Sequence, residues 1–285
     1  TRLLMKAGLI EEREESLEEK VLMRAYPTLL SLDSPHWISY LKENLKAPQR
    51  PTTILDREYA AMLYHTLLSK DLEALGIISP EALILSLSHW HPFIKELEAF
   101  LTMQENALSF LPQSPGVLYP CALEVYCHYT RNQIFAALGY DHPSSIREGV
   151  KFMTPEKSFA VTHPTDVFLV TLNKSDRDFS ETTRYEDYSI DRMTFHWQSQ
   201  STTTPHSKTG QRYERLCREK EKAGYILLFV RENKKDAYGG TQSYTFLGRV
   251  SIERLQGSQP MTAILKLALP LSAGLLTETD ASGVL

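Results

Sequence analysis

The sequence predicts an α+β fold, in which an N-terminal helical unit is followed by a β-rich curled sheet or small barrel with one inserted helix. Of the 285 residues, 42% are hydrophobic and 23% are charged, which is typical of a globular chain of one or two domains. Apolar residues recur at helical spacing in the first half, whereas the second half alternates or is continuously apolar. We therefore place a boundary between residues 1–116 and 117–285.

The first half contains apolar stripes that predict helices, and short polar residues mark where they begin. Pro27 is expected to end or kink the first helix, and Asp56 to cap the third. Residues 112–116 predict a turn or linker, and Thr130 is expected to cap a short helix that ends near Gly139. The helical segments are 11–25, 35–41, 56–68, 79–87, 93–110 and 131–139.

The second half contains five segments that predict strands, with one helix at about 210–222. Such a set of short strands is typical of a curled mixed sheet or small barrel. In the second strand, alternation places Phe195 and Trp197 on a core face and His196, Gln198 and Gln200 on a polar face. The strand segments are 167–172, 193–201, 225–232, 243–250 and 261–269.

Charge is distributed unevenly along the chain. Residues 1–150 contain 13 Lys and Arg against 19 Asp and Glu, whereas residues 205–249 contain 10 against 5. The net charge of −4 excludes a histone-like polycation, but the local excess indicates a phosphate-binding face or, equally, a solvated helix face. No apolar run is long enough to predict a membrane-spanning helix.

The cysteines and the first residue suggest where the protein works. Three sparse cysteines favour a reducing cytoplasm over a disulfide framework. Cys121, Cys127 and His128 lack the further close ligand that a zinc site needs, so we predict no metal here. A chain that opens on Thr1 without a signal core is expected to be a fragment of a longer cytoplasmic protein.

Motifs for catalysis are mostly missing. The sequence has neither a P-loop nor a nucleophile elbow, so we predict no catalytic residue and no cofactor in this fragment. Asp166, Glu186 and Asp187 could hold Mg²⁺ in a divergent nuclease, but the following strand lacks the lysine that would polarise the phosphate. That nuclease stays open as an alternative.

Segment 182–213 and the basic strand exit that follows residue 230 are rich in residues that suit nucleic-acid contacts. Hydroxyls and amides bond phosphate oxygens, arginine and glutamine read base edges, and aromatic rings stack on bases. The alternative is a purely structural role, in which the aromatic residues are buried in the core and the basic residues keep exposed turns soluble. The predicted DNA contacts are Arg184, Tyr185, His196, Gln198, Gln200, Arg212, Tyr213, Arg231, Lys234 and Lys235.

Several strings, in order, carry a resemblance to a known family: FHWQSQSTTTP at 195–205, TGQRY at 209–213, ILLFVRE at 226–232, SYTFLG at 243–248 and QPMTAILKLALPL at 259–271. The region from residue 131 to 271 resembles the uncharacterised C-terminal domain of bacterial superfamily-two DEAD/DEAH-type helicases. Those helicases often carry an N-terminal phospholipase-D-like nuclease domain. The resemblance implies a restriction or phage-defence context and supplies no catalytic residue.

Together these observations predict a non-catalytic module that binds or senses DNA for an attached motor. Residues 117–285 are expected to be the DNA-binding part, and residues 1–116 a connector that docks on the motor. The expected partners are DNA and the helicase and nuclease domains of the same polypeptide, with ATP and Mg²⁺ bound by the motor and no membrane. A structural module that forms homo-oligomers or regulates the motor stays open as a further alternative.

Overall fold

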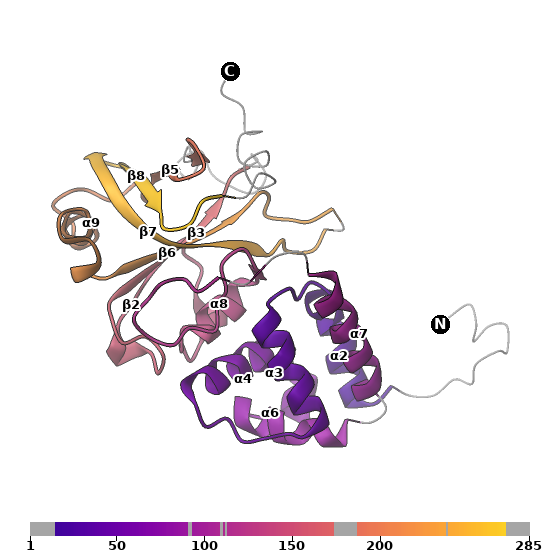
Figure 1. Ribbon diagram of the computed structural model, residues 1–285. Helices are drawn as coiled ribbons and strands as arrows, with labels where there is room; N and C mark the ends of the chain where they lie inside the picture. The colour runs from indigo at the N-terminus through magenta and orange to yellow at the C-terminus, as the bar shows by residue number, and fades with distance from the viewer. Residues whose placement is uncertain are drawn as a thin grey trace.

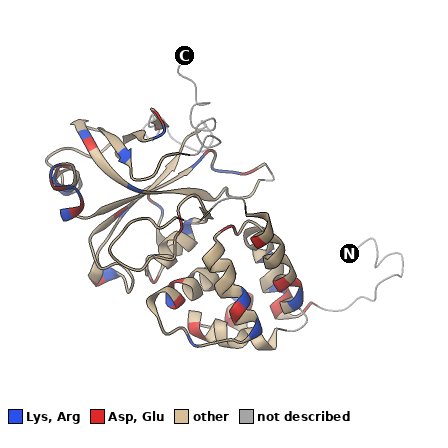
Figure 2. Ribbon diagram, in the orientation of Figure 1, with Lys and Arg blue, Asp and Glu red and all other residues tan. Residues whose placement is uncertain are grey.

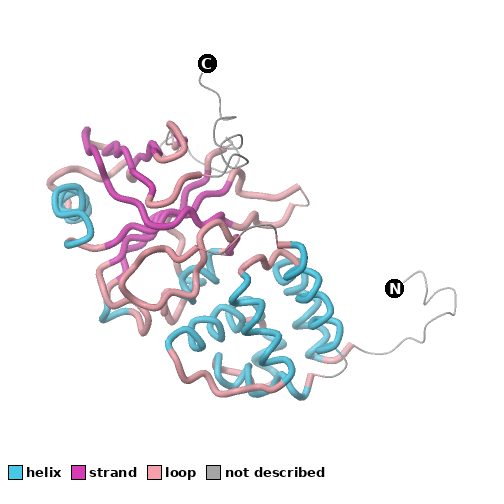
Figure 3. The backbone as a smooth tube through the Cα atoms, viewed as in Figure 1, coloured by secondary structure: helices cyan, strands magenta, loops and turns pink. Residues whose placement is uncertain are grey.

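The computed structural model describes residues 15–90, 93–108, 111, 113–173, 187–237 and 239–271. Helices gather on one side of a strongly curled mixed sheet, and a single helix, α9, lies on its other side (Figures 1 and 3). This arrangement confirms the predicted α+β class. The helices of the first layer are α2 (Leu17–Leu29), α3 (Pro35–Lys46), α4 (Ile54–Leu67), α5 (Lys70–Ala74), α6 (Pro80–Ser86), η1 (Leu87–His89) and α7 (Phe93–Ala107).

Side-chain caps fix where several helices begin. Helix α4 has Thr53 at its N-cap, and Asp56, which was predicted to be the cap, lies three residues further on. Its carboxylate accepts the backbone N–H of Thr53, so the two residues form a capping box. Pro27 lies in the last turn of α2, which continues to Leu29, so the helix does not end at the proline.

The sheet has the strand order β2-β3-β6-β7-β8-β5-β4, and the short β1 pairs with β7. Strands β3 and β6 are parallel, and the other pairs are antiparallel. Strand β7 is longer than predicted and has irregular register against both neighbours, as expected where a strand bends through bulges. The strands are β1 (His128–Tyr129), β2 (Val150–Met153), β3 (Thr165–Thr171), β4 (Tyr188–Ser189), β5 (Thr194–Gln198), β6 (Tyr225–Arg231), β7 (Tyr244–Gly257) and β8 (Met261–Leu267).

The curl brings strands from distant positions of the sheet together around an inner core. Phe168 of β3 stacks on Trp197 of β5 with ring centroids 4.1 Å apart, although three strands separate them in the sheet. Tyr213 of α9 (Lys208–Glu219) packs edge-on against both rings. Offset and edge-to-face aromatic contacts of this kind add to the gain from burial. Helix α9 therefore closes the inside of the curl.

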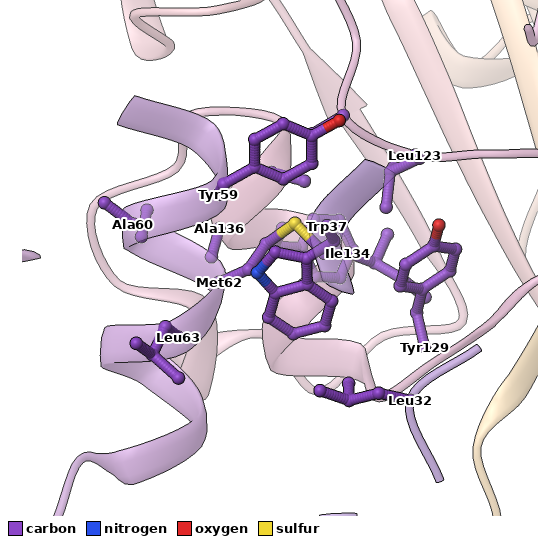
Figure 4. Packing of buried hydrophobic residues seen from close by; sticks show 14 of the residues in the cluster. Leu32, Trp37, Tyr59, Ala60, Met62, Leu63, Leu123, Tyr129, Ile134 and Ala136 are labelled. Atoms are coloured by element: carbon purple, nitrogen blue, oxygen red, sulfur yellow. The ribbon is translucent and has the colours of Figure 1, made fainter. Parts of the chain in front are cut away.

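The opposite face of β3, β6 and the start of β7 packs against the helical layer. Side chains from α3, α4, α8 (Arg131–Ala137) and the segment 123–129 meet there, among them Trp37, Met62, Tyr129 and Ile134 (Figure 4). One apolar cluster runs from Val21 to Phe246, so the core is continuous across residue 116. Two 3₁₀ turns, η2 (Pro143–Ser145) and η3 (Pro155–Lys157), flank β2, and a third, η5 (Lys220–Lys222), follows α9.

Polar contacts also tie the helical layer to the start of the sheet. Ser34 is the N-cap of α3, but its hydroxyl donates to the buried carboxylate of Glu124 and not to its own helix. Asp33 accepts both the backbone N–H of His128, at 2.8 Å, and its ring Nδ1, at 2.6 Å. These contacts join the α2–α3 loop to residues 124–128. Among the described residues, no helix is long and apolar enough to cross a membrane.

Candidate nucleic-acid interface

The predicted alternation of β5 is confirmed. Phe195 and Trp197 are buried, while His196 and Gln198 are half-buried on the other face. The His196 ring stacks on Tyr188 of β4 with centroids 4.6 Å apart, and the backbone N–H of Gln198 donates to Asp187 at 2.9 Å. Gln200 follows the strand and is exposed. This edge of the sheet therefore presents polar groups outward, as the sequence indicated.

Arg184 and Tyr185, and the Glu186 of the nuclease alternative, lie outside the described residues. Asp187 is described and is buried.

Arg212 is half-buried and is bound to a carboxylate. Its Nε and Nη2 donate to Asp166 of β3 at 2.9 and 2.8 Å, and its guanidinium lies 4.3 Å from the ring centroid of Phe152. Asp166 is 1% exposed; burial raises the pKa of this carboxyl, although the hydrogen bonds from Arg212 act in the opposite direction. Tyr213, the next residue, belongs to the core inside the curl. The structure thus gives both residues packing contacts within the fold.

The position of α9 depends on a glycine in the same string. A Cβ at Gly210 would lie 1.9 Å from the carbonyl oxygen of Thr204, so a larger residue there would push the helix away from the preceding loop. Ser207 caps the helix by accepting the N–H of Gly210. The string 209–213 therefore serves to seat α9 on the sheet.

Arg231, Lys234 and Lys235 come together where β6 ends. Arg231 is 7% exposed, donates to Thr171 Oγ1 and the carbonyl of Gln242, and lies with its guanidinium 4.4 Å from the ring centroid of Tyr244. The two lysines are exposed in the turn between β6 and β7. Figure 2 shows basic residues along this turn. The β6–β7 turn therefore carries two exposed lysines, and the buried Arg231 lies at its start.

This turn forms one wall of a groove of about 920 Å³. The end of α2 and the start of α8 form the other side, and the groove lies beyond the ends of the parallel strands β3 and β6. Its lining includes four basic side chains against two acidic ones, together with many hydroxyl and amide groups. The basic residues are Arg131, Arg147, Arg231 and Lys234, and the acidic ones are Glu232 and Asp236.

Arg131 and Arg147 were not among the predicted contacts. Nη1 of Arg131 donates to the carbonyl of Ile146, the residue before Arg147, and its Nε has no hydrogen-bond partner in the described parts of the chain. Arg147 is exposed and forms no ion pair with any residue that the structure describes. Each is an isolated arginine in the sequence, so no charge run could reveal that folding places them opposite the turn.

Carboxylates and thiols do not converge on a metal site in the described part of the chain, where no group of three potential ligands occurs. Asp166 is held by Arg212, and Asp187 accepts the N–H of Gln198. Burial raises the pKa of both the Cys121 and the Cys127 thiol, which favours the protonated form over the thiolate that binds zinc. His128, which was considered with these cysteines and rejected as a zinc ligand from the sequence, is hydrogen-bonded to Asp33.

The fold is that of an α+β protein whose sheet curls into a half-barrel, with α9 packed against the inside of the curl. The groove gives this protein an open, basic, concave surface. The profile of a family described as "Domain of unknown function (DUF3427)" matches residues 123–278, which is more than half of the chain. The chain therefore belongs to this family. The match includes the region from residue 131 to 271 that carries the resemblance noted from the sequence.

Comparisons with individual proteins give little more. No curated protein matches the sequence. Among solved structures, the chain is similar to Arabidopsis thaliana SUVH6 in complex with SAM, with 13% identity and a TM-score of 0.32. The similarity covers 85% of this chain and 41% of that one, so the chain spans less than half the length of that protein.

Proposed function

We propose that this chain is a non-catalytic module that binds DNA for an attached helicase motor and nuclease, in a cytoplasmic restriction or phage-defence protein. The observation that carries the DNA-binding part is the groove, because it brings the predicted contacts Arg231 and Lys234 together with Arg131 and Arg147. Several basic side chains on one concave surface favour a polyanion. Hydroxyls such as Thr130 and Ser243 add the donors that proteins commonly direct at phosphate oxygens.

The helicase context rests on the resemblance of residues 131–271 and extends beyond the family membership itself. ATP and Mg²⁺ would bind the motor and not this chain. The proposal predicts that the complete reading frame encodes a P-loop ahead of the helical layer. A complete frame without any nucleotide-binding motif would contradict the helicase context and leave the DNA-binding proposal to its own test.

The direct test is binding of labelled single-stranded and duplex DNA across a salt series, with and without Mg²⁺. We expect binding that weakens steeply with salt and no cleavage, since phosphate contacts release counterions. The double variant Arg147→Glu/Lys234→Glu should lose most of the binding at the lowest salt. Both side chains are exposed, so the fold should persist.

The matched control is Arg57→Glu/Lys95→Glu, which reverses the charge of two exposed basic residues of the helical layer that do not line the groove. It should leave the binding unchanged. Absence of binding by the wild-type chain at low salt would overturn the proposed function. Cleavage that requires Mg²⁺ would instead support the nuclease alternative.

A further inference from the structure

The basic groups of the groove lie at different depths. Arg231 is almost completely buried at its floor and Arg131 is half-buried, whereas Arg147 and Lys234 are exposed. The outer surface of a duplex is convex, so a duplex would meet the exposed residues and not the recessed ones. A single strand is narrower than a duplex, so it can approach recessed groups such as the half-buried Arg131 more closely than a duplex can.

In the described part of the lining, no phenylalanine, tyrosine or tryptophan ring is open for a base to stack on. Tyr244 is the only aromatic residue in the described lining other than His128. It is 2% exposed, and the guanidinium of Arg231 lies over its ring. The His128 ring is about half exposed and is hydrogen-bonded through Nδ1 to Asp33. Proteins that bind single strands through their bases use large exposed aromatic platforms, and among the described lining residues only this one imidazole is open.

The remaining groups suit a phosphodiester backbone. Guanidinium and ammonium groups bind phosphate oxygens, and the hydroxyls of Thr130, Thr241 and Ser243 can donate to phosphate and sugar oxygens. Ser31 belongs to the α2–α3 connection, so the helical layer supplies part of the lining. The binding surface is therefore built by both parts of the chain and not by the sheet alone.

We propose that the groove binds the sugar–phosphate backbone of one DNA strand without reading its bases. This inference rests on the proposed function and specifies the form of DNA that the groove accepts.

The test compares three labelled ligands of equal length by fluorescence anisotropy: oligo(dT), a strand of abasic residues, and a duplex. The abasic strand should bind within about threefold of oligo(dT), because a stacked base would contribute about fivefold or more on its own. The duplex should bind at least about tenfold more weakly than either strand, since it reaches only the exposed cations.

Charge-removing variants locate the site. Arg147→Gln and Lys234→Gln should each reduce the slope of log K against log salt by about 0.7 for a single strand, which is the contribution of one lost phosphate contact. The control Arg57→Gln, at an exposed arginine outside the groove, should keep the wild-type slope. Circular dichroism checks that each variant remains folded.

The outcomes separate this inference from the function on which it rests. The inference is overturned if the chain binds DNA but prefers the duplex. It is also overturned if the chain binds the abasic strand more than about tenfold more weakly than oligo(dT), because the groove would then depend on the bases. An unchanged salt slope in both groove variants also overturns it. If no DNA of any kind binds, the proposed function fails first.

Discussion

Arg212 and Arg147 carry the same charge but lie in opposite surroundings. Arg212 of α9 is bound to the buried carboxylate of Asp166, and its side chain is 22% exposed. Arg147 is exposed at the groove and forms no ion pair with a described carboxylate. A charge paired with a buried carboxylate is used within the fold, and a charge left open to solvent is available to a ligand. The basic excess of residues 205–249 therefore overstates the binding surface, because part of it is used within the fold.

The contrast between Arg212 and Arg147 is tested most strongly by the substitution Arg212→Ala. This change leaves the Asp166 carboxylate buried without its partner, and breaking a buried pair in this way costs about 3–5 kcal/mol. We expect a loss of that size in the free energy of unfolding, measured by urea denaturation at neutral pH. Binding of oligo(dT) per folded molecule should stay unchanged.

The double variant Asp166→Leu/Arg212→Met is the control, because it replaces both charged groups by apolar ones of similar size. It should recover most of the lost stability, as buried ion pairs are often no more stable than well-packed apolar residues. A loss below about 1 kcal/mol in Arg212→Ala would show that the pair is solvated like a surface pair. In that case Arg212 would be available to DNA, and the contrast with Arg147 would disappear.

Glu58 is a second buried charge-bearing group, on the helical side of the sheet. It is completely buried, and burial raises its pKa to about 9, although the N–H of Ala122 donates to one of its oxygens and opposes this shift. Between the ordinary glutamate pKa and about 9, the folded chain keeps a proton that the unfolded chain has lost. Stability should therefore fall as the pH rises through this range, by up to about 1.4 kcal/mol per pH unit.

Glu58→Gln should remove this dependence, since an amide does not titrate. We expect the difference in unfolding free energy between pH 5 and pH 8 to shrink in the variant, measured by denaturation at each pH. The exposed Glu43→Gln serves as the matched control and should keep the wild-type dependence. Equal pH profiles for the wild type and Glu58→Gln would contradict a protonated Glu58.

Local patterns predicted most elements of this fold. The two-residue alternation of β5 placed Phe195 and Trp197 in the core, and Ser79 followed by Pro80 marked the start of α6. Such features depend on neighbours within a few residues, which the sequence displays directly. Asp56 shows the limit of precision, because a capping box contains two residues that can each resemble a cap.

The candidate site was harder to predict because its residues meet only after the sheet has formed. Arg212 and its partner Asp166 are 46 residues apart, and nothing local indicates that they pair. Arg131 and Arg147 approach the β6–β7 turn because β3 pairs with β6 and β1 with β7. The charge run at residues 231–235 predicted one wall of the groove. The other wall could be identified only from the sheet topology.

The smallest expected effect concerns Gln200, a predicted contact at the end of β5 and outside the groove. Because Gln200 lies outside the groove, Gln200→Ala should weaken DNA binding by less than about twofold, which is below the contribution of a single hydrogen bond. The salt slope should not change, because no charge is removed. The same anisotropy series used for Arg147→Gln measures both quantities.

If Gln200→Ala weakened binding as much as Arg147→Gln does, the polar edge formed by β4 and β5 would be the main DNA contact. The groove would then be a secondary one, and the open charge of Arg147 would no longer distinguish the binding surface from the rest of the molecule.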